Sequence, residues 1–141
     1  ALWGELDYLI VDMPPGTGDI SLTVMQSIPL SGIVMVSIPQ DMVNMIVSKS
    51  INMTKMLNVP ILGLVENMSY IICPHCGEKI KIFSGENTDE FLKENNITLL
   101  GELPTDVTVS GMADNGYSNI KAEIAEEFEK ITDNVIAALN K

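Results

Sequence analysis

The sequence contains no arginine. All eight of its basic residues are lysine, and they face 19 acidic residues, for a formal net charge of −11. Without arginine the chain has no arginine finger and no bidentate guanidinium clamp for a phosphate group. Affinity for polyanions depends largely on Lys and Arg, so this acidity disfavours nucleic acid and anionic membranes. We therefore expect neither nucleic acid nor a membrane among the partners.

Long apolar runs and cysteines are also scarce. No run approaches the roughly 18 residues that a membrane span needs, and the first residues lack the order of a signal peptide. The two cysteines form one CxxC pair, which excludes a disulfide framework and suits a reducing compartment. We expect a cytoplasmic protein. Because a strand pattern follows Ala1 almost at once, we interpret residues 1–141 as a single partial domain.

Continuous apolar runs alternate with helical patterns along the chain. The predicted strands are Tyr8 to Val11, Gly32 to Ile38, Ile61 to Val65 and Thr98 to Leu103. The predicted helices are Asp19 to Ser27 and Asp41 to Leu57, each capped by its aspartate, then Asn87 to Asn95 and an acidic helix from Ile120 to Leu139. Runs that are apolar on both faces favour a parallel sheet covered on both sides. The fold class predicted is α/β, with a partial doubly wound, mostly parallel sheet.

Polar loops follow each predicted strand, so they are expected to gather at the carboxyl edge of the sheet, where such folds bind ligands. These loops are Asp12 to Gly16, Pro39 to Asp41, Glu66 to Ser69 and Pro104 to Asp106. Residues 70–85 break the alternation and predict an inserted β-hairpin that carries Cys73-Pro74-His75-Cys76-Gly77.

The first loop has the chemistry of a nucleotide site. An apolar strand that ends in Asp12 can place a carboxylate beside a nucleotide-bound Mg²⁺, and Gly16 lets a backbone N–H approach a phosphate. The alternative is a plain Pro-Gly turn, but the two residues together favour a functional role.

Several motifs, in this order, resemble the Mrp-type P-loop ATPases, the iron-sulfur cluster carriers of the MinD/ParA-like superfamily. The motifs are Trp3 to Tyr8, Asp12 to Asp19, Pro39-Gln40-Asp41, Asn58 to Ser69, Cys73 to Gly77 and Gly101 to Pro104. The resemblance implies that Asp12 serves Mg²⁺ as the catalytic carboxylate and that Gly16 senses the γ-phosphate. It also implies that Asn67 binds the adenine edge, helped by the Pro104 loop.

One part of the family pattern is absent. The phosphate loop of the family ends in Gly-Lys-Ser/Thr, and this sequence contains no Gly-Lys dipeptide. The resemblance implies that the intact protein is an ATPase that uses ATP and Mg²⁺. We expect the chain alone, a C-terminal portion lacking this loop, to be inactive as an ATPase.

The CxxC motif offers two thiolates on one tight turn, an arrangement found in both zinc and iron-sulfur sites. Four-thiolate coordination needs a second pair, so Cys73 and Cys76 of two chains in a homodimer give the simplest complete site. His75 is not predicted as a ligand. A thioredoxin-like redox pair is less favoured, because that pair begins a helix.

By resemblance, the intact protein is an ATP-dependent carrier that holds a 4Fe-4S cluster between two chains and passes it to apo iron-sulfur client proteins. Two alternatives remain open: a non-catalytic dimerisation module bridged by zinc, and a positioning ATPase of the MinD/ParA type. The acidic terminal helix counts against the second, because anionic lipid would repel it.

Overall fold

The computed structural model describes residues 2–83, 88–106 and 122–140. Along the chain the elements are α1 (Asp19–Ser27), β1 (Ile33–Ser37), α2 (Asp41–Met56), β2 (Ile61–Ile72), β3 (Lys79–Lys81), α3 (Thr88–Asn95), β4 (Leu99–Pro104) and α5 (Ala122–Leu139). The predicted helices are confirmed within a residue or two. Three ends of predicted elements lie outside the described residues: 84 and 85 of the hairpin, 87 of the third helix, and 120 and 121 of the terminal helix.

β2 is the central strand of a mixed sheet. Leu64 of β2 pairs in parallel with Met35 of β1 and with Leu99 of β4, so these two strands lie on opposite edges of β2. Tyr70, further along β2, pairs with Lys81 of the antiparallel β3 and with Pro104 of β4. β3 therefore continues the β1 edge, and the prediction of a mostly parallel α/β sheet is confirmed.

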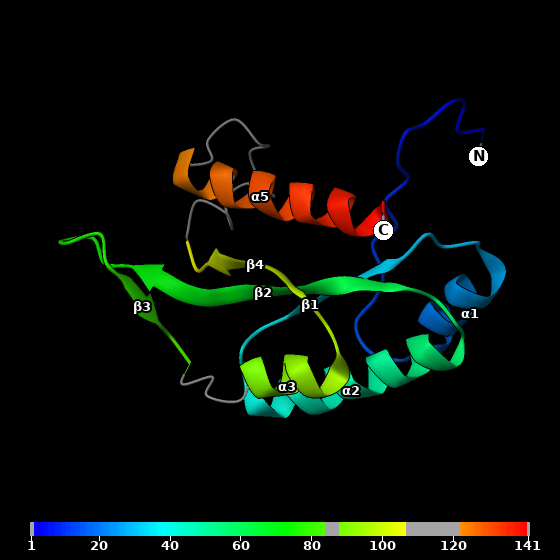
Figure 1. Ribbon diagram of the computed structural model, residues 1–141, viewed down its shortest axis with the longest axis horizontal. Coiled ribbons are helices and arrows are strands. Elements are labelled where there is room, and N and C mark those ends of the chain that lie inside the picture. Colours follow the sequence, from blue (N-terminus) through cyan, green and yellow to red (C-terminus); the bar gives the residue numbers. More distant parts are fainter. Residues whose placement is uncertain (1, 84–87, 107–121, 141) are drawn as a thin grey trace.

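Helices cover both faces of the sheet: α2 and α3 lie on one face and α5 on the other (Figure 1). The main core lies on the α2 and α3 side. Its buried members are Met35, Val47, Ile51, Leu64 and Leu92. Burying such aliphatic side chains contributes about 1.5–3 kcal/mol each, which makes this cluster the main stabilising contact of that face.

α5 packs against β4 and β2 on the opposite face. Ile124 is 1% exposed, and the Asn134 side-chain amide donates a hydrogen bond of 2.8 Å to the Leu100 carbonyl oxygen. Gly101 permits a close approach, since a Cβ built there would lie 2.4 Å from Cγ1 of Ile131. The stripe of apolar residues predicted for this helix thus meets the sheet as expected.

The strand predicted at Tyr8 to Val11 is wrong. This segment is neither strand nor helix, and Ile10 is 90% exposed. A strand requires a hydrogen-bonded neighbour, and none of the described strands pairs with these residues. The apolar composition of a segment does not show whether another strand lies beside it to pair with.

Two local predictions also need correction. Glu66 to Ser69, predicted as a loop, lie within β2, where three residues oppose Leu103 between the pairs Glu66–Glu102 and Tyr70–Pro104. Met68 adopts a φ of 55° in this bulge. The N-cap positions of α1 and α2 are Gly18 and Gln40, so each aspartate begins its helix instead of capping it. In α1, the negative charge of Asp19 in the first turn still complements the helix dipole.

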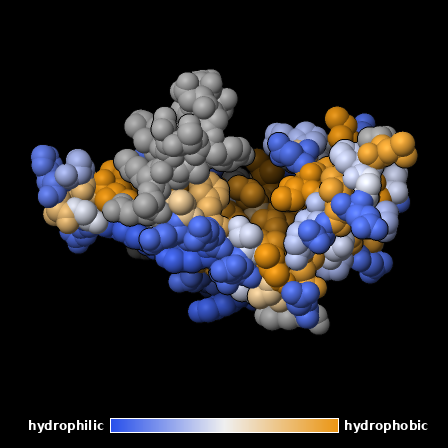
Figure 2. Space-filling view, turned by 90° about the horizontal axis from the view of Figure 1, so that it is seen from above, coloured by the Kyte–Doolittle hydropathy of each residue, from blue (hydrophilic) through white to orange (hydrophobic). Residues whose placement is uncertain are grey.

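Apolar surface gathers around a hollow on the side where Figure 1 places α1 and the N-terminal segment (Figure 2). Leu9, Ile10, Ile20 and Ile28 are among the exposed apolar residues. None of the described helices is long and apolar enough to cross a membrane.

Candidate functional site

The two cysteines lie in the turn of the hairpin that joins β2 to β3. The Cys73 N–H donates to the Glu78 carbonyl oxygen, and the Gly77 N–H donates to the Cys73 carbonyl oxygen, each at 2.9 Å. Gly77 has a φ of 74°, a left-handed conformation that glycine adopts without strain. These bonds close the turn that the Cys-Pro-His-Cys-Gly sequence predicts. The hairpin extends away from the body of the molecule (Figure 1).

Backbone N–H groups in the turn favour the ionised form of Cys73. They lower the pKa of the Cys73 thiol, with the largest effect from the Cys76 N–H and the next from the His75 N–H. Partial desolvation opposes this effect. Cys73 is half-buried and Cys76 is exposed. The thiolate is the nucleophilic and metal-binding form of cysteine, so this turn favours the form that either role requires.

The turn provides only part of a metal site. Within residues 2–83, 88–106 and 122–140, no three His, Cys, Asp or Glu side chains lie close enough together to hold a metal ion. If Cys73 and Cys76 ligate a metal, as the sequence predicts, the further ligands must come from outside the described part of the chain.

The root of the hairpin is fastened to α5 by one lysine. The Lys79 Nζ lies 4.4 Å from the centre of the Tyr70 ring and 3.6 Å from the Glu127 carboxylate. Tyr70 and then Glu127 raise the pKa of Lys79, so the ammonium form is favoured. Next to this contact is a cavity of about 290 Å³ between the hairpin, the end of β4 and α5. Sequence reasoning missed this contact, because its partners come from separate elements.

Asn67 and Pro104 lie on neighbouring strands. Asn67 is in the bulge of β2, where its side-chain oxygen accepts a 2.9 Å hydrogen bond from the Met68 N–H. Pro104 is buried at the end of β4, and the Thr105 N–H donates to the Tyr70 carbonyl oxygen at 2.8 Å. Asn67 and Pro104 therefore lie on hydrogen-bonded neighbouring strands but are not directly paired, since Pro104 pairs with Tyr70.

Asp12 and Gly16 lie in the irregular segment before α1. Asp12 is exposed, and Gly16 has a φ of 83° with open space where a Cβ would lie. Among the described residues, no hydrogen bond or ion pair joins either residue to Asn67 or Pro104. Among the described residues, the segment of Asp12 and Gly16 is thus not joined to the strands that carry Asn67 and Pro104.

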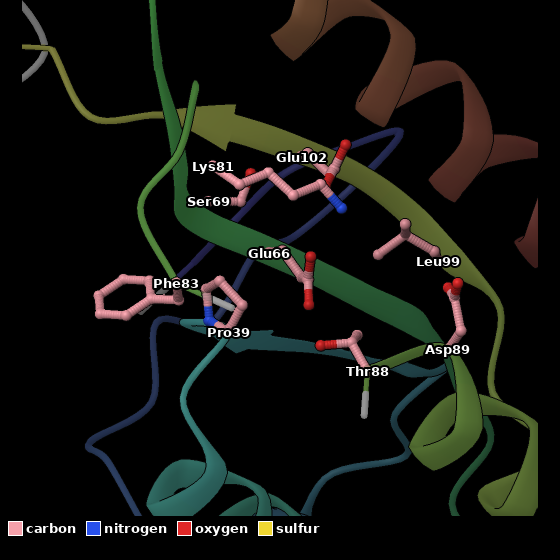
Figure 3. A pocket seen from close by; sticks show the side chains of 9 residues that line it. All are labelled: Pro39, Glu66, Ser69, Lys81, Phe83, Thr88, Asp89, Leu99 and Glu102. Carbon is pink, nitrogen blue, oxygen red and sulfur yellow. The ribbon is translucent and has the colours of Figure 1, made fainter. Parts of the chain in front are cut away.

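A small polar chamber, missed from the sequence, opens beside the Glu66 carboxyl group (Figure 3). Its volume is about 60 Å³, and it is lined by Pro39, Glu66, Ser69, Lys81, Phe83, Thr88, Asp89, Leu99 and Glu102. Glu66 is 6% exposed, and burial raises the pKa of its carboxyl group. The Thr88 hydroxyl and Lys81 oppose that rise, whereas Glu102 and Asp89 add to it. The only sequence signal for this chamber is a glutamate that directly continues the apolar run Gly63 to Val65.

A parallel sheet with helices on both faces and polar residues at its carboxyl edge defines an α/β protein of the doubly wound class. The family model for ParA, described as the NUBPL iron-transfer P-loop NTPase, matches residues 1–139. The chain belongs to this family, which confirms the resemblance seen in the sequence.

Named relatives agree with this assignment. An iron-sulfur cluster carrier protein of Methanocaldococcus jannaschii is 42% identical over 138 residues, covering 96% of this chain and 48% of the relative. One from Clostridium perfringens is 49% identical over 114 residues, covering 81% of this chain and 40% of the relative. The chain thus spans about half the length of these relatives, or less.

A solved structure matches the fold. It is a nucleotide-binding protein from Archaeoglobus fulgidus in complex with ADP, in which cobalt was found. The match has a TM-score of 0.71 and 43% identity, and it covers 81% of this chain and 47% of that one.

Proposed function

We propose that this chain is part of an iron-sulfur cluster carrier in which Cys73 and Cys76 hold the cluster that is carried. The observation that carries the proposal is the CxxC turn at the end of an extended hairpin, where backbone N–H groups lower the pKa of the Cys73 thiol. The relatives named as cluster carriers support it. The cluster is cargo, and release to apo-protein clients requires the ligands to lie near the surface, as Cys76 does.

The cluster bridges two chains in this proposal. One chain offers two cysteines, whereas a 4Fe-4S cluster takes four thiolates. A twofold axis beside the hairpin turn supplies the second pair from an identical chain, which is the simplest closed assembly. The hairpin presents its turn to such a partner without obstruction from the helices.

The nucleotide end of the proposal concerns the intact protein. There Asn67 and Pro104 would contact the adenine, Asp12 would hold Mg²⁺ as the catalytic carboxylate, and Gly16 would face the γ-phosphate. The position of Asn67 and Pro104 on the paired strands β2 and β4 supports the adenine part. ATP hydrolysis by the intact protein would then act on the dimer that holds the cluster.

Anaerobic reconstitution with iron and sulfide tests the cluster site. We expect the wild-type chain to turn brown, with an absorbance band at about 400 nm and about four iron atoms per dimer. Cys73→Ser and Cys76→Ser should each both lose the cluster and weaken the dimer, because the cluster needs a complete cysteine pair from each chain. His75→Ala is the matched control in the same turn, and it should keep both.

Iron content and mass by light scattering are measured on the same samples. A full cluster on the Cys73→Ser variant, or a cluster on a monomer, would contradict the proposal. A colourless dimer that contains one zinc ion would instead identify the structural zinc module.

A further inference from the structure

The hairpin that carries the cysteines has two different faces. Tyr70 and Lys79 belong to the face that meets α5, where the Lys79 ammonium group lies over the Tyr70 ring and beside Glu127. Ile71 and Ile80 pair directly across β2 and β3, so they project together from the other face. One face of the hairpin is therefore fastened to the body of the molecule, whereas the other presents paired isoleucines.

Three isoleucines make this second face apolar and accessible. Ile71, Ile80 and Ile82 are 38%, 46% and 42% exposed. The Ile82 N–H donates to the Ser69 carbonyl oxygen, which continues the β2–β3 ladder by one pair beyond β3. Because side chains alternate along a strand, Ile82 lies on the same face as Ile80. We call these three residues the isoleucine face.

The isoleucine face leads to the cysteine turn. At the other end of β3 the Cys73 N–H donates to the Glu78 carbonyl oxygen, so the ladder also continues there by one pair. Cys73 follows Ile71 by two residues and therefore lies on the isoleucine face. A partner that covers this face is brought directly to Cys73.

A second copy of the chain is the occupant that the cysteine site requires. In the proposed function one chain offers two thiolates, and an identical chain must approach the turn to bring the other two. The formal net charge of −11 makes two copies repel each other over much of their surface. Uncharged isoleucines allow close approach without placing like charges together.

We propose that two chains pack hairpin against hairpin through the isoleucine face, about a twofold axis that runs along the hairpin. Rotation about this axis places Ile80 of one chain opposite Ile71 of the other, and it brings both cysteine turns to the same end. Antiparallel pairing of two β3 edges would instead point the turns in opposite directions. The inference rests on the proposed function, in which two chains share four cysteines.

The size of the isoleucine face limits the strength of the contact. Stable interfaces bury about 1,200–2,000 Å² in total, and three partly exposed isoleucines from each chain fall well short of that area. Chains without a cluster are therefore held together only weakly, and the shared cluster supplies the rest of the stability. A carrier built in this way separates into single chains when it delivers its cargo.

Disulfide cross-linking between two chains of different length tests the arrangement without iron. In a Cys73→Ser/Cys76→Ser background, one chain carries Ile71→Cys and the other carries Ile80→Cys. Mild oxidation should join them about tenfold faster than it joins Ile71→Cys to Lys79→Cys, because only the first pair is held face to face. Lys79 is the matched control, since it precedes Ile80 in the same strand but belongs to the face that meets α5.

Two further variants separate the isoleucine face from the exposed apolar surface near α1. Ile82→Lys in both chains should slow the cross-link about tenfold, because two ammonium groups then meet across the interface. Ile10→Lys adds the same charge to the N-terminal segment and should leave the rate unchanged. Every isoleucine substituted in these tests is more than a third exposed, so each variant should keep the wild-type circular dichroism spectrum.

Equal rates for the two cysteine pairings, or a cross-link that Ile82→Lys does not slow, would overturn the proposed interface. Because the experiment contains no iron, its result is separate from that of reconstitution. A cluster-bound wild-type dimer together with equal cross-linking rates would reject the isoleucine face and keep the carrier function. Specific cross-linking without a cluster on the wild-type chain would do the reverse.

Discussion

Glu66 shows how neighbouring groups set the chemistry of a single residue. It is a carboxyl group on the central strand, and burial is the largest influence on its pKa, which lies above the ordinary 4.5. Glu102 adds repulsion from the next strand, and the Thr88 hydroxyl and Lys81 reduce it. Its protonation is therefore coupled to the packing between the sheet and α3.

This environment predicts a pH dependence of stability. Between pH 4.5 and the raised pKa, folded Glu66 keeps a proton that the unfolded chain releases, so stability should fall as pH rises through that window. The loss is at most about 1.4 kcal/mol per pH unit for one group. Glu66→Gln has no proton to lose and should lack this decrease.

Urea unfolding from pH 4 to pH 8 at constant ionic strength, for wild type and Glu66→Gln, measures the difference. Parallel pH profiles for the two proteins would show that Glu66 titrates alike in the folded and unfolded chains.

At the scale of elements, α5 packs closely against the sheet at a glycine of β4. The Gly101 backbone of β4 lies against Ile131, and Asn134 of α5 fastens the helix to the neighbouring Leu100 carbonyl group. Together with the Lys79–Glu127 contact, this packing fixes α5 beside the root of the hairpin. The position of the cysteine turn therefore depends partly on a helix remote from it in sequence.

Gly101→Ala should destabilise the chain by about 1–3 kcal/mol, the usual cost of overpacking. The added Cβ would lie 2.4 Å from Cγ1 of Ile131, so helix or strand must shift. Guanidinium unfolding measures the loss. Ile131→Ala in the same background removes the clashing atom, so the double variant should be more stable than the sum of the two single losses implies. Strict additivity would contradict close packing at this point.

At the scale of the molecule, the predicted nucleotide-site residues fall in two parts of the structure that no described strand pairing joins. Asn67 and Pro104 are joined through the β2–β4 pairing, whereas the segment of Asp12 and Gly16 pairs with no described strand. Exposed apolar side chains such as Ile10 lie in that same segment. Such surface invites self-association at high concentration.

We expect the chain to bind Mg-ATP weakly and not to hydrolyse it. The phosphate loop that the sequence lacks would supply about four charge-assisted hydrogen bonds at about 1.5 kcal/mol each. Their loss amounts to about 6 kcal/mol, or roughly ten-thousandfold in affinity. Isothermal titration calorimetry measures this, with the Archaeoglobus fulgidus protein and ADP as the positive control. Micromolar Mg-ATP binding by the 141-residue chain would contradict it.

The sequence by itself determined the helices, three of the strands and the cysteine hairpin. The pattern of apolar residues within each element is enough for these predictions. The apolar stripe of α5 and the continuous apolar runs of β1, β2 and β4 each indicate which side chains are buried. The order of short motifs also identified the family, because glycine, proline and cysteine at fixed spacing reflect backbone requirements that few folds share.

Only the tertiary structure decided which residues meet. The apolar run at Tyr8 to Val11 failed as a strand, because pairing is a property of two segments and not of one. The sequence predicted Glu66 as a loop residue, whereas its pairing with Glu102 shows that it lies inside the sheet. The unpaired Ser69 hydroxyl and the Lys79–Glu127 contact likewise depend on elements distant in sequence. The spacing of apolar residues indicates which face of a helix or strand is buried. Which residues pack against that face is decided by how the whole chain folds.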